Sequence, residues 1–287
     1  MRVRFWGTRG SIPVSLTWRD LRDRLVRALV AANGHDLDTI EKAVAFTEQH
    51  LDFSLTHTFG GHSACVEFEP GAKAQPDTYF VCDMGSGARA FGEHVLARQA
   101  GRPATIHVFM SHMHWDHIMG FPFFGPAFDA GATIVIHSGH ADAEAALRRQ
   151  QEEISFPVPF DWLRAKFEFV VHEPGVPFEA GGLIVTLAAQ HHSHDSYGYR
   201  FEKGGRAVVY STDSEHKVEA MDAETAFEAF FAGADLVICD TMYSLGDTVS
   251  LKQDWGHSSN VVAVDLCHAA DAKRLALFHH EPTYTDD

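Results

Sequence analysis

Short apolar runs bounded by Gly, Asp or Pro recur along most of the chain. Runs such as TIHVFM, TIVIHS, LIVTLA, AVVYST and LVICD are rich in β-branched and other apolar residues, a pattern that predicts β-strands. The predicted strands cover residues 2–6, 64–69, 78–83, 105–110, 132–137, 166–171, 183–189, 197–202, 206–211, 235–239 and 273–278.

Between several of these runs, apolar residues recur at the three- and four-residue spacing of a helix. The predicted helices cover residues 87–100, 141–153, 222–232 and 258–270. Strands that alternate with helices favour a layered α/β architecture. Because no internal repeat, low-complexity tract or linker interrupts the pattern, we expect one domain over residues 1–287.

Residues 17–51 depart from this alternation. Leu21, Leu25 and Leu29, and later Ile40 and Val44, lie at helical spacing, and the sequence ANGHD separates the two sets. The pattern predicts a helical hairpin inserted between the first two strands. We expect a surface decoration packed on the sheet, with a lid or a dimerisation element as the alternative.

Composition narrows the class of protein. The 287 residues are 45% hydrophobic and 22% charged, and no apolar run approaches the ~20 residues that a membrane helix needs. The N-terminal MRVRFWGTRGSIP lacks the features of a secretory signal. Four cysteines without CxxC spacing lie in apolar segments: Cys65, Cys82, Cys239 and Cys267. These features predict a cytoplasmic protein with buried, reduced thiols and no membrane partner.

The formal net charge of -16 disfavours a long nucleic acid as partner, because proteins that bind polyanions usually present a basic face. We therefore expect a small substrate, and the chain is expected to act alone or as a homodimer. The 20 histidines direct the search towards metal sites.

The segment SHMHWDH directly follows a predicted strand. His112 and His114 are two residues apart, so both side chains can face the same way on an extended chain. Asp116 and His117 follow where the chain should turn, and they can face a second ion. Imidazole nitrogens and carboxylate oxygens bind zinc and similar ions, so this pattern predicts a metal site rather than a merely polar loop.

Three later positions also follow predicted strands: the pair His191 and His192, Asp213, and His279. Open α/β sheets place their functional sites at the carboxyl ends of strands. We therefore expect these side chains to complete the metal site at one rim.

Several motifs carry a resemblance to a known family. GTRGSIP, TFGGHSACVEFE, CDMGSGAR, SHMHWDHIMGFPFF, YGYRFE, VVYSTDSE, ADLVICDTMY, WGHSS and FHHEPTYTDD resemble, in order, the metallo-β-lactamase superfamily. The branch they resemble most contains ribonuclease Z, the phosphonate-pathway cyclic phosphodiesterase and bacterial proteins described as cyclic-nucleotide phosphodiesterases. The resemblance covers nearly the whole chain except residues 17–51. It implies a four-layer αββα sandwich with two divalent metal ions at one edge, zinc first, with manganese or iron as alternatives.

The resemblance also implies the ligands of each ion. The first ion would take His112, His114 and His192; the second would take Asp116, His117 and His279; Asp213 would bridge both. Two choices depend on neighbouring histidines. His192 fits the distance to GYR at 198–200 better than His191, with His194 as a further alternative. His279 is the first residue past its strand and should point to the rim, whereas His280 should point away.

Two such ions about ~3.5–4 Å apart can share a hydroxide and offset charge on a phosphoryl group. His257, in DWGHSSN, resembles the branch's substrate-facing histidine and would bind phosphate or protonate the leaving group. Asp240 would orient it. With Asp116 at the reacting centre, these two form the expected catalytic set. The alternatives are a surface histidine at a helix start for His257 and a structural turn residue for Asp240.

Four further residues have weaker predictions. Asp83 is expected either to accept a hydrogen bond from a metal-bound histidine or to cap the helix that begins near residue 87. Arg9, Arg200 and Lys217 are candidates for phosphate contact, although such side chains are more often solvated charges.

The preferred function is a phosphodiesterase that acts on small substrates such as cyclic nucleotides. One alternative is a tRNA 3′-processing endoribonuclease, although that enzyme carries a basic, Gly-rich arm and the insertion at 17–51 mixes charges. Others are a thioester or lactone hydrolase and a metabolite sensor with a metal centre. The chain has no GxSxG, Walker or GxGxxG motif, which argues against a serine hydrolase or a dinucleotide-binding protein.

Overall fold

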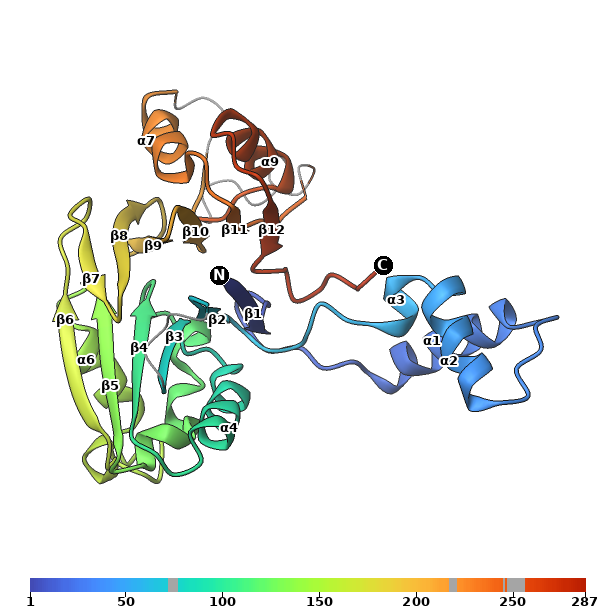
Figure 1. The fold of residues 1–287 in the computed structure, drawn as a ribbon, viewed down its shortest axis with the longest axis horizontal. Helices are drawn as coiled ribbons and strands as arrows, with labels where there is room; N and C mark the ends of the chain where they lie inside the picture. Colours follow the sequence, from blue (N-terminus) through green and yellow to red (C-terminus); the bar gives the residue numbers. More distant parts are fainter. Residues whose placement is uncertain (72–76, 217–220, 245, 247–255) are drawn as a thin grey trace.

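Two six-stranded sheets face each other at the centre of the molecule (Figure 1). A computed structural model describes residues 1–71, 77–216, 221–244, 246 and 256–287. The first sheet has the order β1 (Arg2–Gly7), β2 (Cys65–Glu69), β3 (Thr78–Cys82), β4 (Ala104–Met110), β5 (Ala132–Ser138) and β6 (Lys166–Val171). The second has the order β12 (Leu275–Phe278), β11 (Leu236–Asp240), β10 (Arg206–Ser211), β9 (Ser196–Lys203), β8 (Leu183–Gln190) and β7 (Phe178–Ala180).

Alternating side chains along the strands build three apolar layers. In β3, Tyr79 and Val81 point to the outer face of the first sheet, whereas Phe80 and Cys82 point into the layer between the sheets. Helices α4 (Ala88–Gln99) and α6 (Ala143–Gln150) cover the outer face of the first sheet. Helices α7 (Met221–Phe231) and α9 (Asn260–Ala269) cover that of the second. The predicted αββα sandwich is therefore confirmed.

The strand directions bring distant parts of the sequence to one edge. β3 and β4 are parallel neighbours in the first sheet, and β10, β11 and β12 are parallel neighbours in the second. Within each sheet, the residues that follow these strands therefore leave the same edge. The polar residues singled out in the sequence occupy that position after β3, β4, β10, β11 and β12.

The structure adds short elements that the apolar pattern did not predict. They are β7, the helices α3 (Phe53–Thr56) and α5 (Trp115–Ile118), and the 3-10 turns η1 (Phe121–Phe123), η2 (Gly125–Phe128) and η3 (Phe160–Trp162). Each is too short to show a period in the sequence. Among them α5 matters most, because it turns the chain directly after His114 and buries Asp116 and His117.

The insertion forms two helices, α1 (Trp18–Ala31) and α2 (Ile40–His50), as predicted. Thr17 and Asp20 close a capping box at the start of α1. No residue of α1 is buried, and α2 buries only Phe46. The expectation that the insertion packs on the sheet was wrong: α1 packs mainly against α3, and residues 17–51, here called the arm, project away from the sandwich (Figure 1).

All four cysteines are buried and free of disulfides, as their apolar surroundings predict. Among the helices of the described residues, none combines the length and the hydropathy that a membrane crossing requires.

A chain of three histidines lies between the sheets. Nδ1 of His107 is 3.0 Å from Nε2 of His137, whose Nδ1 is 2.9 Å from Nε2 of His172. Phe178 of the second sheet stacks on His172. Burial lowers the pKa of His137 to about 3 and also lowers the pKa values of His107 and His172. These three histidines are therefore neutral near pH 7.

The free energy of unfolding should therefore fall as the pH drops below about 6.5, because the unfolded chain then protonates His137 and the folded chain does not. Replacing His137 with Phe should reduce this fall by about 1.4 kcal/mol per pH unit, between about pH 5.5 and about pH 4.5. Urea titrations of both proteins at these two pH values measure the difference. Equal pH dependence in the two proteins would contradict the neutral state of His137.

Candidate metal centre

The seven side chains predicted as metal ligands meet at the edge of the two sheets. They follow β4, β8, β10 and β12, and comprise His112, His114, Asp116, His117, His192, Asp213 and His279. Residues that are up to 167 positions apart in sequence, such as His112 and His279, thus share one site. The structure brings the predicted set together completely.

One group of donors consists of His112, His114 and His192, whose ring nitrogens lie within 4.8 Å of one another. Nε2 of His192 is 3.1 Å from Nδ1 of His114. Nε2 of His112 and Nε2 of His192 are each 3.7 Å from Oδ2 of Asp213. Three nitrogens and one carboxylate oxygen therefore converge, a donor set that suits a four-coordinate ion.

A second group consists of Asp116, His117 and His279. Nε2 of His117 is 3.3 Å from Oδ2 of Asp116, and Nε2 of His279 is 3.2 Å from the same oxygen. Oδ1 of Asp213 lies 3.1 Å from Nε2 of His117 and 3.3 Å from Nε2 of His279. Asp213 thus presents Oδ2 to the first group and Oδ1 to the second, as a bridging carboxylate must.

Left-handed backbone directs three side chains to this edge. Asp83, Asp213 and His279 have φ values of 58°, 48° and 61°, and each follows the end of a strand. This region is sterically unfavourable for residues with a Cβ, and strain of this kind tends to accumulate at functional sites. The turn lets the chain leave the strand while its side chain stays at the rim.

Asp83 holds His117 from behind. Its Oδ2 is 2.8 Å from Nδ1 of His117, and it also accepts hydrogen bonds from Ser111 Oγ at 2.7 Å and Tyr210 OH at 2.8 Å. This contact turns Nε2 of His117 towards the site, the arrangement that carboxylates give to metal-bound histidines. Of the two roles predicted for Asp83, the structure supports this one, since α4 begins without a side-chain cap.

Adjacent histidines separate clearly in space. His192 donates from Nδ1 to Gly256 O at 2.9 Å and directs Nε2 into the site. His191 is exposed and packs its ring against Phe227, while His194 stacks on His140. The geometry therefore favours His192 as a ligand over both alternatives.

The pair after β12 divides in the same way. His279 is 1% exposed and faces Asp116. His280 instead packs its ring against Phe59, 5.2 Å away between centroids, and burial lowers its pKa to about 4. His280 therefore belongs to the packing behind the site.

The electrostatics of the site favour bound cations. Burial opposes protonation of His117, but the carboxylates of Asp213, Asp116 and Asp83 hold its pKa well above the usual range. A positive charge at Nε2 of His117 is thus stabilised, whether it is a proton or a metal ion. His112 behaves differently, because burial and the neighbouring His117 lower its pKa well below the usual range and leave it neutral.

The buried nitrogens fit a metal as well. Among the described residues, Nε2 of His112 and Nε2 of His117 are buried without a hydrogen-bond partner. A buried polar atom without a partner is costly, and a metal ion at each of the two donor groups would satisfy these nitrogens. Neutral imidazoles and ionised carboxylates are the donors that zinc, manganese and iron accept. The donor set therefore fits divalent cations.

His257 lies beside both groups of donors. Its ring centroid is 5.2 Å from that of His192 and 5.0 Å from that of His279. Nδ1 of His257 is 2.7 Å from Oδ2 of Asp240, so the structure places Asp240 where an orienting partner must be. Burial lowers the pKa of His257, but Asp240 outweighs it and raises this pKa to about 9, which favours the imidazolium form.

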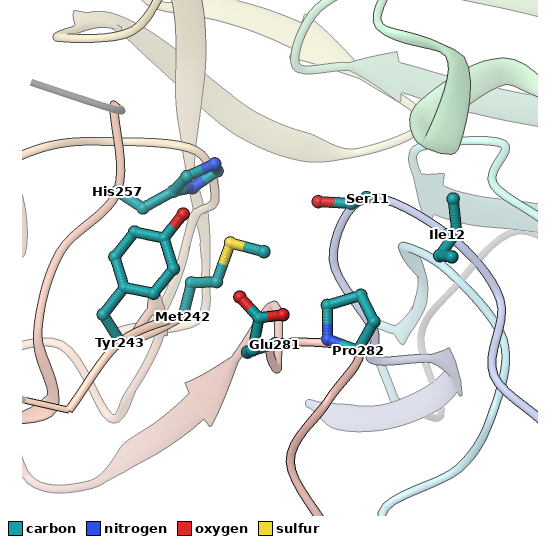
Figure 2. Close-up of a pocket in the computed structure, with 7 residues that line it drawn as sticks. All are labelled: Ser11, Ile12, Met242, Tyr243, His257, Glu281 and Pro282. Carbon is teal, nitrogen blue, oxygen red and sulfur yellow. The ribbon is translucent and has the colours of Figure 1, made fainter. Parts of the chain in front are cut away.

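A cavity of about 570 Å³ opens beside His257 (Figure 2). It is lined by Ser11, Ile12, Met242, Tyr243, His257, Glu281 and Pro282. In Figure 2 the Glu281 carboxylate points into this space, between Met242 and Pro282. The ring of Tyr243 stands edge-on to that of His257, 5.7 Å away between centroids.

Neither Tyr243 nor Glu281 was predicted as a site residue, although each lies inside a motif that carries the family resemblance. Tyr243 ends ADLVICDTMY and Glu281 lies in FHHEPTYTDD. Ser11, in GTRGSIP, was missed too, and its backbone N–H donates to Asp116 Oδ2 at 2.9 Å. The sequence feature that could have revealed these three residues was therefore their position inside the family motifs, since no residue pattern of known chemistry includes them.

The candidate phosphate contacts lie elsewhere. Arg9 is buried and donates to Gly60 O and Tyr284 O, which ties the N-terminal region to the C-terminal segment. Arg200 donates to Phe230 O and Ala232 O. Both arginines therefore hold backbone in place. Lys217 lies outside the described residues.

Comparisons with known proteins agree with this architecture. A family model described as the beta-lactamase superfamily domain matches residues 78–280. A ribonuclease Z of Lacticaseibacillus casei is 32% identical over 255 residues, which cover 71% of this chain and 76% of the relative.

Two solved structures show the same fold. Human tRNase Z, short form, superimposes with a TM-score of 0.60 at 19% identity, covering 100% of this chain and 97% of the other. A diphosphatase from the PhnP family superimposes with a TM-score of 0.58 at 16% identity, covering 99% of this chain and 88% of the other.

Replacing His192 with Ala should lower the bound divalent metal of the purified protein by about one ion per chain, because it removes one of three nitrogens that converge on Asp213. The matched change of His191 to Ala should leave the metal content unchanged, since that side chain is exposed and faces Phe227. Elemental analysis after gel filtration measures both. Loss of metal from the His191 variant alone would assign the ligand to His191 instead.

Proposed function

Because the chain belongs to the metallo-β-lactamase superfamily, in the branch that contains ribonuclease Z, we propose that it is a dinuclear metal-dependent hydrolase of small phosphodiesters such as cyclic nucleotides. The observation that carries the proposal is the pair of donor groups joined by Asp213, which opens beside a cavity of about 570 Å³. Zinc is the ion we propose first, with manganese or iron as alternatives.

The seven predicted ligands would hold the two metal ions. Divalent ions held there would supply an activated water and would offset the charge that builds on the phosphoryl oxygens. Asp213 would keep the two sites at a fixed separation. Asp83 would hold the His117 ring, and the Ser11 N–H would hold one oxygen of Asp116.

The cavity supports a small substrate. Its volume falls in the range of about 300–1,000 Å³ typical of pockets that bind small molecules. Its described lining contains neither Lys nor Arg, whereas proteins that hold an RNA backbone neutralise its phosphates with these residues. Glu281 would repel any phosphate beyond the scissile one and would accept a hydrogen bond from a substrate hydroxyl or amine.

His257 and Asp240 would assist the leaving group. Asp240 fixes the ring through Nδ1, so Nε2 is the atom that would meet a phosphoryl oxygen or the departing alkoxide. Asp240 is itself held, since it accepts hydrogen bonds from the backbone N–H groups of Ser214 at 3.2 Å and Met242 at 3.0 Å. A positioned general acid of this kind contributes about 10²–10⁴-fold to the rate.

Endoribonucleolytic processing of tRNA is the second candidate. Its support is the ribonuclease Z of Lacticaseibacillus casei, at 32% identity. We place it second because the chain carries a net charge of -16 and the described cavity lining contains neither Lys nor Arg. Nothing in the described site favours a thioester or lactone hydrolase or a metabolite sensor. A cytoplasmic location completes the proposal, supported by the four buried free cysteines.

The metal-loaded protein should hydrolyse bis(p-nitrophenyl) phosphate and at least one of the 2′,3′- and 3′,5′-cyclic nucleotides, with kcat/KM greater than on a precursor tRNA. Added chelator should abolish the activity, because the proposed reaction depends on the bound ions. Product formation by chromatography measures all substrates under one set of conditions. Faster cleavage of the precursor tRNA would reverse the order of the two candidates.

Replacing His257 with Gln should lower kcat about 10²-fold or more on a cyclic nucleotide while the metal content stays unchanged. The loss should be much smaller on bis(p-nitrophenyl) phosphate, whose leaving group departs without a proton. Replacing Asp240 with Asn should give the same pattern with a smaller loss. Steady-state kinetics on both substrates, with elemental analysis, test this; equal losses on both substrates would rule out leaving-group protonation.

A further inference from the structure

Among its described lining residues, the cavity beside His257 has one carboxylate, that of Glu281. Glu281 is 8% exposed and directs its carboxylate into this space (Figure 2). Its Oε1 accepts hydrogen bonds from the hydroxyl of Thr283 at 3.2 Å and from the backbone N–H of the same residue at 3.4 Å. The side chain therefore has a fixed place in the cavity wall. Because an ionised carboxylate offers about four acceptor positions, it can be held by the chain and still meet a ligand.

The surroundings of Glu281 determine what a ligand must bring. Ile12, Met242 and Pro282 contribute apolar surface, and the described lining contains neither Lys nor Arg. Burial and, after it, the Glu281 carboxylate raise the pKa of Tyr243, so the charge of Glu281 acts on other groups of the cavity. A ligand that covers this carboxylate must give it a hydrogen-bond donor, since a carboxylate buried without one is costly.

The positive charge already assigned to the site favours a neutral donor. The proposed reaction places two divalent ions and a protonated His257 next to the scissile phosphate. A substrate ammonium group beside them would be repelled, because like charges in a site with little water interact strongly. A hydroxyl donates a hydrogen bond to a carboxylate without adding charge. The substrate group that faces Glu281 is therefore a hydroxyl.

His257 indicates where this hydroxyl lies in the substrate. The His257 ring and the Glu281 carboxylate border the same open space (Figure 2). Asp240 holds Nδ1 of His257 at 2.7 Å, which leaves Nε2 to protonate the leaving oxygen. A donor that shares this space with the leaving oxygen belongs to the leaving group. The hydroxyl is therefore on the carbon next to the one that carries the leaving oxygen.

The cyclic nucleotides differ in whether they meet this requirement. In a 3′,5′-cyclic ribonucleotide the 2′-hydroxyl is next to O3′, and it can donate a hydrogen bond. In a 2′,3′-cyclic nucleotide both neighbouring oxygens are part of the ester, so neither has a proton to donate. A 2′-deoxynucleotide has no oxygen at this position.

We propose that Glu281 accepts a hydrogen bond from the 2′-hydroxyl of 3′,5′-cyclic ribonucleotides and selects them over 2′,3′-cyclic and 2′-deoxy substrates. This inference rests on the proposed phosphodiesterase function. Water adds to phosphorus, the bond between phosphorus and O3′ breaks, and O3′ takes the proton of Nε2 of His257. One water thus supplies the new oxygen on phosphorus and, by exchange at His257, the proton on O3′. The product is a 5′-monophosphate with a 3′-hydroxyl.

Kinetics on matched cyclic nucleotides test the proposal. For the metal-loaded wild type, kcat/KM should be at least about tenfold greater on 3′,5′-cyclic AMP than on its 2′-deoxy analogue, which leaves Glu281 without a donor. Glu281→Leu should reduce this ratio to about one, and Glu281→Gln, which keeps an acceptor without the charge, should give an intermediate ratio. The matched control Glu93→Leu changes an exposed glutamate of α4 and should keep the wild-type ratio.

The products and the metal content separate the possible outcomes. Chromatography should show 5′-AMP, whereas 3′-AMP would overturn the proposal, since O5′ has no hydroxyl on a neighbouring carbon. A wild-type ratio near one, a ratio that Glu281→Leu leaves unchanged, or faster cleavage of 2′,3′-cyclic AMP would also overturn it. Loss of metal from the Glu281 variants, measured by elemental analysis, would assign Glu281 to the metal centre instead.

A second substrate distinguishes this inference from the function on which it rests. If the wild type hydrolyses bis(p-nitrophenyl) phosphate but shows no preference for the 2′-hydroxyl, the role of Glu281 is wrong and the phosphodiesterase function stands. If the metal-loaded protein hydrolyses neither bis(p-nitrophenyl) phosphate nor any cyclic nucleotide, the proposed function fails, and the role of Glu281 fails with it.

Discussion

The candidate site depends on one carboxylate that faces two ways. Asp213 leaves the end of β10 in a left-handed conformation and presents one oxygen to His112 and His192, the other to His117 and His279. These histidines come from the ends of β4, β8 and β12. A bridging ligand of this kind requires that the strands of both sheets end at the same edge. The sandwich therefore provides the arrangement of strand ends on which the site depends.

This concentration of buried polar groups is expensive unless cations balance it. Asp83, Asp213 and Asp240 are almost fully buried, and desolvation of ionised carboxylates costs several kcal/mol each. Hydrogen bonds from Ser111, Tyr210 and backbone N–H groups offset part of that cost. Two divalent ions would offset much of the rest, and the same carboxylates hold the pKa of His117 well above its usual range.

The proposed preference for a small substrate depends on the size and the charge of the surroundings of the site. Tyr243, Met242 and Glu281 line a cavity of about 570 Å³, a volume within the range of about 300–1,000 Å³ typical of pockets that bind small molecules. The arm does not supply the basic surface that a tRNA would need, since only α1 carries an excess of arginine and half of its arginines pair within the chain. Human tRNase Z, short form, has the same fold, and a shared fold does not by itself fix the substrate.

The sequence by itself determined the strands, the major helices and the identity of the seven candidate ligands. Short apolar runs such as that of β3 reveal strands, and histidines that follow such strands stand out because metal chemistry needs few residue types. It favoured His192 over His191 only through the family resemblance, by the distance to GYR at 198–200, because the direction of a side chain cannot be read from the residue pattern.

Only the tertiary structure decided that choice, the role of Asp83 behind His117, the position of Glu281 in the cavity and the exposure of α1. The physical reason is common to all four. Helical or strand periodicity is local and tells which face of an element is apolar, but the partner of that face is fixed by contacts between residues far apart in the chain.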